Sequence, residues 1–366
     1  MLINDTVLKS DERAAFLLRS LYKSYGYSHY KMSKFEEYAL YIKNKDFLVS
    51  DGIISFTDTS GKLLALKPDV TLSIINNSKD DLGQVQKLYY DENVYRISSS
   101  SHSYKEIKQT GLECIGDVGL YEVCEVVMLA IASLKTITSN YMLEISHAGI
   151  VESVFEELGI FGDNKKTLLN CIWSKNTDEL LTNCDELGVD ESVKASLVTF
   201  VANYKTFDDA VAALKKVCVG DKSKQQLCEF ESILDVIAKN SLDKNVCVDF
   251  SLSNNMSYYS GVAFKGYIEG IPASVISGGR YDKLMQNMGK KSGAVGFAVY
   301  LDALERYNFS EKEYDVDTVI IHNNNISAAL DKANELINNG LSVRVCEKIP
   351  TDVKYKNIID LKGEDK

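Results

Sequence analysis

The sequence predicts an α+β fold, in which one mostly antiparallel sheet has helices packed on it and carries a helical insertion. Strand patterns occur on both sides of a stretch from about 150 to 240 that holds helical patterns and almost no strand pattern. Because the flanking strands can join in one sheet, we expect a single α+β core around the insertion. The 366 residues allow two or three domains, or one large domain with attachments, and the composition of 45% apolar and 25% charged residues is typical of a globular protein.

The elements before the insertion follow from apolar spacing and from turns rich in Gly, Asn, Asp and Ser, because the chain has only three prolines. A run of serines around His102, between two of the strands, predicts a flexible loop. In chain order we expect a helix over 11–25, strands over 52–57 and 62–66, a helix over 70–78, strands over 86–96 and 109–116, a helix over 119–135 and a strand over 140–147.

The insertion and the end of the chain have distinct patterns. Six helices are expected in the insertion, over 153–158, 165–173, 177–187, 191–203, 207–217 and 222–239. After it come strands over 246–252, 258–268 and 272–277, a helix over 280–288, and a small-residue strand or turn over 293–299. A strand–helix–strand unit is expected over 316–322, 326–338 and 341–346. We therefore expect a core over 1–310 and a short C-terminal unit over 314–366.

Charge and cysteine spacing exclude several classes of protein. The net charge is −11 and the pI is near 5.0, so nucleic-acid binding is unfavoured, because phosphate contacts need clustered Lys and Arg. The eight cysteines form no CxxC pair, which argues against structural zinc, and we expect neither a metal nor another cofactor. Without a signal-like N-terminus or an apolar run of membrane-spanning length, we expect a reduced, soluble, cytoplasmic protein.

Four blocks of residues become informative together. In this order and spacing they resemble the catalytic domain of histidyl-tRNA synthetases, which have a class II aminoacyl-tRNA synthetase fold with a helical insertion. The resemblance covers roughly residues 10–305. The most specific part is GGRYD followed by AVGFA and preceded by YYSG. The blocks are Lys67–Thr71 (KPDVT), Val94–Arg96 with Gln109–Glu113 (QTGLE), Ser257–Phe264 (SYYSGVAF), and Gly278–Asp282 with Ala294–Ala298.

The resemblance implies a site for the backbone groups of free histidine. The position of Asp69, usually Glu in that family, holds the ammonium with help from Thr71. The positions of Arg96 and Gln109 face the carboxylate. Charge-assisted hydrogen bonds of this kind contribute about 1.5–3 kcal/mol each. Taken alone, Asp69 after Pro68 is more typical of a helix N-cap, and Arg96 of a strand-edge cation.

The same resemblance implies a site for the imidazole. Glu113 and Tyr259 match the pair that reads the ring, and Tyr281 closes the pocket. Glu113 also stands between apolar strand residues, where an inward carboxylate needs a partner. Tyr258 completes the expected histidine-binding set. Because Tyr258 and Tyr259 are adjacent in a predicted strand, we expect them to face opposite sides, one in the core and one toward the ligand.

Departures from the synthetase pattern fall where ATP would bind. Ala303 replaces an arginine that stacks on adenine in the family, and Asn254 and Ser257 replace an Arg and an Asp. The serine run replaces an arginine-rich loop, and Ser33 replaces a proline of the dimer-forming signature. Three lost charged contacts at about 1.5–3 kcal/mol each remove enough binding to abolish useful adenylation. We expect no aminoacylation and no catalytic residues of the chain's own.

This combination resembles a paralogous family, the regulatory subunits of ATP phosphoribosyltransferase. That family keeps a histidine-like pocket and lacks a full anticodon-binding domain, of which residues 314–366 resemble only the start. The resemblance implies a non-catalytic, allosteric subunit that a short catalytic chain needs for activity in the first step of histidine biosynthesis. It implies L-histidine as feedback ligand, and a homodimer within a hetero-oligomer. Feedback then requires that histidine bind two states with different affinities.

Two alternatives stay open from the sequence. A divergent histidyl-tRNA synthetase would be an enzyme, and histidine-dependent exchange of pyrophosphate into ATP would identify it. Another synthetase paralogue that senses an amino acid or uncharged tRNA would be a binding module, and tRNA binding at low salt would identify it. Family resemblance alone does not decide among these functions.

Overall fold

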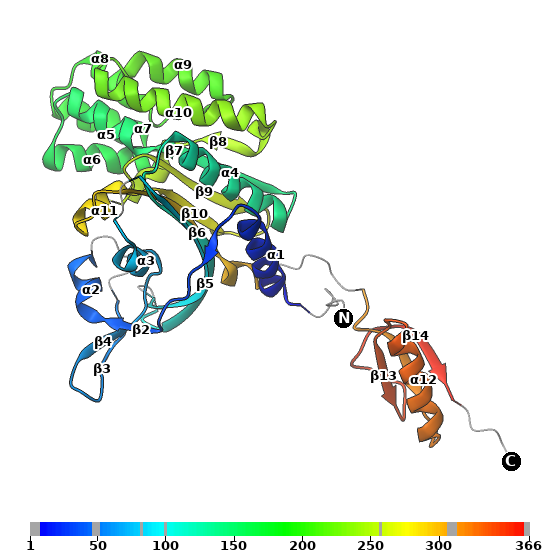
Figure 1. Ribbon diagram of the computed structural model, residues 1–366. Helices are drawn as coiled ribbons and strands as arrows, with labels where there is room; N and C mark the ends of the chain where they lie inside the picture. The colour runs from blue at the N-terminus through cyan, green and yellow to red at the C-terminus, as the bar shows by residue number, and fades with distance from the viewer. Residues whose placement is uncertain are drawn as a thin grey trace. The chain divides into compact units, whose positions relative to one another are not determined.

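Eight strands form one sheet in the first part of the chain, and helices lie on both of its faces (Figure 1). The chain divides into two units, Met1–Tyr307 and Asn308–Lys366. Among the described residues, no helix has the length and apolar character needed to cross a membrane. The computed structural model describes residues 8–45, 52–80, 83–98, 101–255, 258–305 and 313–361.

The large sheet is mostly antiparallel, as predicted. Across it the strands are β1 (Ser28–His29), β5 (Val85–Ile97), β6 (Tyr104–Gly116), β11 (Gly293–Tyr300), β10 (Ile276–Arg280), β9 (Val262–Ile268), β7 (Tyr141–His147) and β8 (Val246–Val248). Only the two edge pairs, β1 with β5 and β7 with β8, run parallel. Strands from before and after the insertion therefore meet in the middle, where β6 pairs with β11.

Neighbouring residues of β5 show how the two faces are covered. Tyr89 points to one face, where its ring lies 6.3 Å from that of Tyr22 on α1 (Ser10–Ser24). The long helix α4 (Leu120–Ile137) covers the same face beside α1, and the hydroxyl of Tyr22 bonds with Ser133 of α4. Tyr90 points to the opposite face, because successive strand side chains alternate.

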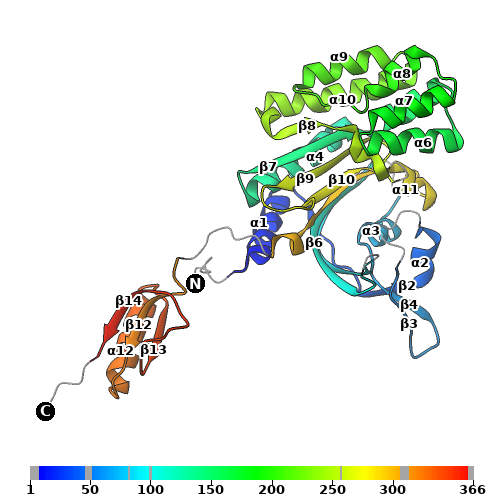
Figure 2. The ribbon, with the colours of Figure 1, turned by 180° about the vertical axis from the view of Figure 1, so that it is seen from behind.

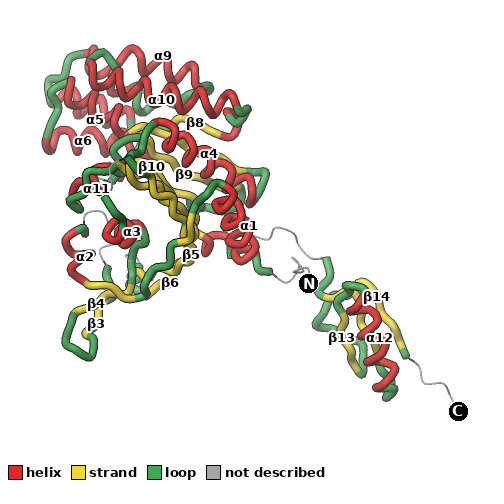
Figure 3. The backbone as a smooth tube through the Cα atoms, viewed as in Figure 1, coloured by secondary structure: helices red, strands yellow, loops and turns green. Residues whose placement is uncertain are grey.

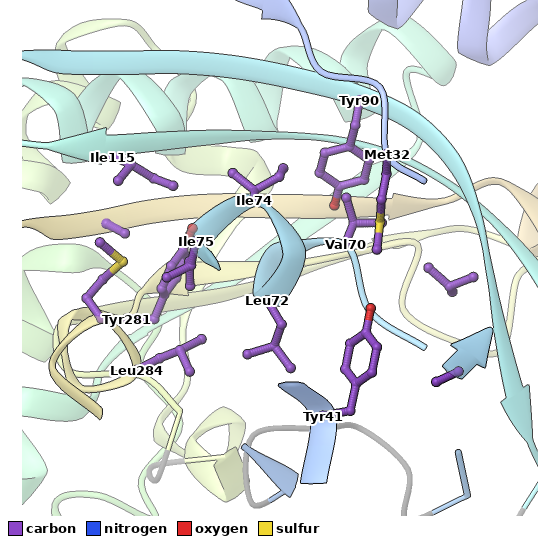
Figure 4. Packing of buried hydrophobic residues seen from close by; sticks show 14 residues of the cluster. Met32, Tyr41, Val70, Leu72, Ile74, Ile75, Tyr90, Ile115, Tyr281 and Leu284 are labelled. Atoms are coloured by element: carbon purple, nitrogen blue, oxygen red, sulfur yellow. The ribbon is translucent and has the colours of Figure 1, made fainter. Parts of the chain in front are cut away.

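The opposite face carries a smaller layer of short elements. Tyr90 belongs there to a buried cluster with Leu72, Ile115 and Tyr281 (Figure 4). The elements are β2 (Phe35–Glu37), α2 (Tyr38–Lys43), β3 (Ser55–Thr57), β4 (Leu63–Leu66), α3 (Thr71–Asn77) and α11 (Asp282–Asn287). Strands β2, β4 and β3 form a separate antiparallel sheet in that order. The hairpin of β3 and β4 and the helix α3 were predicted, whereas β1, β2 and α2 are too short to show a periodic pattern.

The insertion consists of helices at the β7–β8 edge of the sheet (Figures 2 and 3). All six predicted helices form, although the fourth ends at Val198 and not at residue 203. Their bounds are α5 (Ala148–Glu157), α6 (Gly162–Trp173), α7 (Thr177–Glu186), α8 (Glu191–Val198), α9 (Phe207–Val217) and α10 (Asp221–Lys239). Helix α10 packs on α5, α9 and α4, which joins the insertion to the layer that covers the sheet.

Several predicted boundaries in the sheet are wrong. The strand expected over 246–252 ends at Val248, and the short 3-10 helices Asp243–Asn245 and Phe250–Asn255 flank it. The strand expected from 258 begins at Val262, so the two tyrosines precede it. The strand expected over 272–277 is Ile276–Arg280 and includes both glycines. Tight packing of glycine against neighbouring strands, and not strand propensity, sets this last boundary.

The hairpin of β5 and β6 is longer than predicted. Its strands pair as far as Ile97 and Tyr104, where the backbone of Ser98 bonds with that of Ser103. The expected serine loop, residues 98–103, lies between the ends of these two strands. Ser99 and Ser100 of that loop lie outside the described residues.

The unit Asn308–Lys366 contains a small parallel sheet with one helix. The strands β12 (Val316–Ile321) and β13 (Val343–Cys346) and the helix α12 (Ile326–Asn338) match the predicted strand–helix–strand pattern. A third strand, β14 (Tyr355–Asp360), was not predicted, and it pairs with β12 on the side away from β13. Ile320, Ala329 and Ala333 form the buried centre of this unit.

Candidate functional site

A row of small residues leaves room on the face of the large sheet that α3 covers. Glu113 on β6 lies opposite Gly296 on β11, which in turn lies opposite Gly279 on β10. The neighbouring row places Gly111 opposite Ala298. A Cβ atom on Gly296 would overlap the carboxylate of Glu113, so this glycine is needed for the acid to lie flat across the sheet.

Glu113 is the centre of the site. It is 2% exposed, and it accepts hydrogen bonds from the hydroxyl of Thr71 at 2.7 Å and from that of Tyr281. The pKa of Glu113 is raised to about 8, mainly by burial and to a smaller extent by the nearby Asp69 charge, while the hydrogen bonds from the two hydroxyls offset part of the rise. The carboxyl group is thus held in place, desolvated, and mostly protonated at pH 7.

Asp69 lies beside this acid at the start of α3. One carboxylate oxygen accepts the backbone N–H of Leu72 at 2.9 Å, which is the helix-capping role expected of an aspartate here. Its other oxygen lies 3.9 Å from a terminal nitrogen of Arg96. Burial raises the pKa of Asp69 above its usual value, and the Arg96 charge offsets part of that rise. Asp69 can therefore cap α3 and belong to the site at the same time.

Arg96 and Gln109 come from the two strands of the long hairpin. The Nε of Arg96 donates to the carbonyl oxygen of Pro68 at 2.9 Å, which fixes the guanidinium while its terminal nitrogens face Asp69. Gln109 is 3% exposed and lies two residues before Gly111 on the same sheet face as Glu113. No described residue forms a hydrogen bond with the Gln109 side chain. Its amide is therefore free to form hydrogen bonds with a polar group that enters the pocket.

The three tyrosines form one aromatic wall. The ring of Tyr258 lies 4.9 Å from that of Tyr259 and 5.7 Å from that of Tyr281. Burial raises the pKa of Tyr258 well above its usual value, and the charges of Asp69 and Glu113 add to the rise. The expectation that Tyr258 and Tyr259 face opposite sides is wrong, because both precede β9 and are not in alternating strand geometry.

Two further tyrosines contribute to the site and were not predicted. Tyr90 is buried opposite Gly111, and burial with the charges of Glu113 and Asp69 raises its pKa well above the usual value. Tyr300 lies opposite Gln109, and its pKa is raised by burial and lowered in part by Arg96. Only the register of β5, β6 and β11 places these rings here. The sequence gives no signal for that register.

The structure brings the eight predicted residues to one face of the sheet and links most of them directly. Contacts join Thr71 and Tyr281 to Glu113, and Arg96 to Asp69. Gln109 is the member without a described contact to the others. The combination of two buried acids, one guanidinium and an aromatic wall suits a small zwitterion with a flat, cationic side chain. In the described part of the chain, no group of three His, Cys, Asp or Glu side chains is arranged to hold a metal.

The positions at which this chain departs from the histidyl-tRNA synthetase pattern lie in several parts of this unit. Ala303 belongs to a short 3-10 helix, Leu301–Leu304, directly after β11. Ser33 precedes β2, where its hydroxyl donates to the carbonyl oxygen of Phe35 at 2.8 Å. Asn254 falls in the 3-10 helix after β8, and Ser257 lies outside the described residues. An alanine methyl can neither stack on a base nor neutralise a phosphate.

Comparison with known proteins places the chain in a family. The family described as histidyl-tRNA synthetase matches residues 6–304. An ATP phosphoribosyltransferase regulatory subunit from Clostridium botulinum is 30% identical over 319 residues, which cover 83% of this chain and 75% of that protein.

Solved structures agree on the fold. A crystal structure from Bacillus halodurans, described as an ATP phosphoribosyltransferase regulatory subunit/histidyl-tRNA synthetase, has a TM-score of 0.77 at 24% identity and covers 96% of this chain and 93% of that one. A chain of the ATP phosphoribosyl transferase complex from Thermotoga maritima has a TM-score of 0.63 at 21% identity, over 80% of this chain and 97% of that one. The chain therefore belongs to the histidyl-tRNA synthetase family, and within it to the regulatory subunits of ATP phosphoribosyltransferase.

Proposed function

We propose that this regulatory subunit binds L-histidine in the pocket around Glu113 and thereby lowers the activity of a separate, short catalytic chain. The observation that carries the proposal is a buried glutamate, held by Thr71 and Tyr281, beside a second buried acid that faces Arg96. Such a site costs free energy when empty and becomes favourable when a ligand supplies matching charges.

The charges select the ligand. Asp69 and Glu113 can carry two negative charges and Arg96 carries one positive charge, so the ionised site has a net charge of −1. Histidine with a charged ammonium, a carboxylate and a protonated imidazole has a net charge of +1 and balances the site. The ordinary pKa of imidazole, about 6.5, allows protonation when a carboxylate is adjacent. The ligand is therefore expected to bind with its ring against Glu113.

Each charged group of the bound histidine has a matching group in the pocket. The ammonium lies toward Asp69, and the carboxylate toward Arg96 and the unpartnered amide of Gln109. The ring lies against the wall of Tyr258 and Tyr259, since aromatic faces pack well against a flat cation. Histidinol, which lacks the carboxylate, should therefore bind about tenfold to a hundredfold more weakly than histidine, since charged hydrogen bonds contribute about 1.5–3 kcal/mol.

The chemical step belongs to the catalytic chain in this proposal. Ala303 stands where an adenine-stacking arginine would be needed, so a bound histidine meets no activated nucleotide on this subunit. Histidine instead changes the complex by binding one of its states more tightly, and a coupling of about 1–3 kcal/mol gives a fivefold to 150-fold effect. We expect a homodimer of this chain within the larger assembly, in keeping with the symmetry of most oligomers.

The direct test is a reconstituted assay with the organism's own short catalytic chain. ATP phosphoribosyltransferase turnover is measured with and without this protein, at zero and millimolar histidine. Turnover should rise when this subunit is added and fall when histidine is added. Calorimetry on the subunit alone should show one histidine site per chain. Equal turnover with and without this subunit, with the catalytic chain verified as folded, would contradict the regulatory role.

A matched pair of variants tests the site. Glu113→Gln removes the buried charge and should weaken histidine binding by about tenfold to a hundredfold, with activation of the catalytic chain retained. Glu106→Gln makes the same change on the same strand, where the side chain bonds with Asn93 and Tyr95 at the surface, and should leave binding unchanged. Equal histidine affinity in the two variants would place the ligand elsewhere.

A further inference from the structure

One carboxylate joins the helical insertion to the strand that carries the pocket. Glu229 lies on α10, and its two oxygens face different partners. One lies 3.4 Å from Nε2 of His147 at the end of β7, and the other lies 3.5 Å from a terminal nitrogen of Arg280 at the end of β10. The insertion is therefore held to the sheet by charge as well as by apolar packing.

Arg280 carries this link to the pocket. Its Nε donates to Asp282 at 2.8 Å, and a terminal nitrogen donates to the carbonyl oxygen of Val118 at 3.3 Å. The next residue in the chain is Tyr281, whose hydroxyl donates to Glu113. Since adjacent backbone units move together, displacement of the guanidinium would tilt the Tyr281 ring away from the buried acid.

A second connection reaches the tyrosine wall. The backbone N–H of Ser260 donates to the carbonyl oxygen of Arg280 at 2.8 Å, and the Ser260 hydroxyl accepts the N–H of Asp282 at 2.9 Å. Ser260 directly follows Tyr259 in the chain. The residues that contact Glu113 and those that form the aromatic wall are thus both bonded to the segment that Glu229 holds.

The environment makes this link stronger than a surface ion pair. The side chains of Glu229 and Arg280 are 26% and 21% exposed, and His147 is fully buried against the ring of Phe230. The bond from His147 and the charge of Arg280 hold the pKa of Glu229 below its usual range, although burial opposes them. Glu229 is therefore charged near neutral pH. Partly desolvated pairs are screened less than exposed ones.

We infer that Glu229 is a positioning residue that couples the placement of the helical insertion to histidine binding. This inference rests on the proposed function, because it concerns the same pocket. Coupling is reciprocal, so histidine should steady the insertion to the extent that the insertion steadies the pocket. The insertion then becomes the element through which an empty or filled pocket can be read by a partner chain.

The test compares two glutamates of the same helix. Glu229→Gln removes the charge that faces Arg280, whereas Glu231→Gln removes a charge that pairs with Lys215 within the insertion at 2.7 Å. Calorimetry on the full chain should give about tenfold weaker histidine binding for Glu229→Gln and no change for Glu231→Gln. Glu229→Asp keeps the charge and should recover part of the lost affinity. Circular dichroism confirms that each variant is folded.

Two further measurements separate positioning from a general loss of stability. In protein that already carries Arg280→Gln, the change Glu229→Gln should add little, because the guanidinium that Glu229 faces is already absent. Hydrogen exchange should show that histidine protects α5 and α10 in the unchanged protein and in Glu231→Gln, and that this protection is lost in Glu229→Gln. Additive losses in affinity, or equal protection in both variants, would overturn the inference.

Failure of the proposed function gives a different result. If the unchanged protein binds no histidine, the pocket is not a histidine site. The coupling is then judged on the protein without ligand, where Glu229→Gln should raise hydrogen exchange in the segments 258–261 and 280–284 severalfold above that of Glu231→Gln. Equal exchange in the two variants would overturn the inference on its own.

Discussion

The insertion and the pocket of the same unit are built in opposite ways. Helix α9 shows the first: it buries Ala210, Leu214 and Val217 and begins with a Thr206 cap whose hydroxyl accepts the N–H of Asp209. The pocket instead buries polar and charged side chains: Glu113, Gln109 and Arg96 are each less than 10% exposed. The insertion follows the general rule that helices bury apolar side chains. The pocket departs from that rule at the side chains that can contact a ligand.

The difference teaches where function lies in this fold. Every departure in the pocket is costly by itself, because a buried charge or unpaired amide lowers stability. These costs are concentrated on one face of three strands, whereas the described part of the insertion carries only the link through Glu229 and the buried, unpartnered indole N–H of Trp173. Changes in the pocket should therefore alter histidine binding strongly, and changes on the insertion surface should alter it little.

Gly296→Ala should have the largest effect on binding. Its Cβ would overlap the Glu113 carboxylate and would lie 2.5 Å from the carbonyl oxygen of Leu112. Overpacking of this kind costs about 1–3 kcal/mol of stability. We expect histidine affinity to fall by more than about a hundredfold, because one charged contact is displaced and the pocket floor is raised.

The control is Gly119→Ala, where the nearest atom to the new Cβ is 3.4 Å away, an ordinary contact. It should bind histidine normally. Calorimetry measures the affinity and urea unfolding the stability. If Gly296→Ala binds histidine as well as the control does, the ligand does not lie against this row of the sheet.

The stability of the ligand-free protein should decrease as the pH rises, because of Glu113. The pKa of this side chain rises from 4.5 to about 8 on folding, so the folded state favours the protonated form. The stability contributed by that form is fully present below pH 4.5 and is lost as the pH rises through about 8. Between pH 5 and 9, the unchanged protein should therefore lose about 4 kcal/mol relative to Glu113→Gln. Urea unfolding of both proteins at several pH values measures this, and parallel pH profiles would contradict it.

Tyr281→Phe should have an intermediate effect. The change removes the hydroxyl that donates to Glu113 and leaves the ring in the buried cluster. Since that bond holds the pKa of Glu113 down, its loss should raise the pKa further and weaken histidine binding by about fivefold to tenfold. Tyr121→Phe, which removes an exposed hydroxyl that donates to Glu125, serves as the control. A loss of binding in both variants would point to a nonspecific cause.

Asp235→Asn should have the smallest effect. Asp235 pairs with Lys239 one turn later on α10, and both side chains are more than half exposed. Such pairs contribute at most about 0.5 kcal/mol. We expect unchanged histidine affinity and a change in unfolding free energy near the error of measurement. A tenfold change in affinity would mean that the insertion surface itself contributes to the site, which would break the contrast between the two regions.

Much of the fold could be predicted from the sequence, for a physical reason. Helices such as α9 and α10 bury one side only, so their apolar spacing appears directly in the residue order. The antiparallel sheet followed from strand patterns on both sides of the insertion. The misplaced boundaries lie mainly at Tyr258–Tyr259 and Gly278–Gly279, where close approach to the pocket and not periodicity decides the backbone.

The site was only partly accessible to the same reasoning. The order and spacing of four blocks indicated the eight residues through family resemblance, whereas their convergence depends on pairing between distant strands. Tyr90 and Tyr300 illustrate the limit, because each is an ordinary strand tyrosine until the register places it opposite Gly111 or Gln109. The link through Glu229 likewise needs the packing of α10 against the sheet edge, which helical periodicity does not specify.

The pairing of β6 with β11 has a consequence for the newly made chain. Glu113 and the hydroxyl that holds it are 168 residues apart in sequence, and the whole insertion lies between them. During synthesis the first half of the pocket leaves the ribosome long before the second, at roughly 5–20 residues per second. Contacts of such long range form late, after local helices. A nascent chain thus has no complete pocket until its sheet is complete, so under the proposed function only fully folded subunits would respond to histidine.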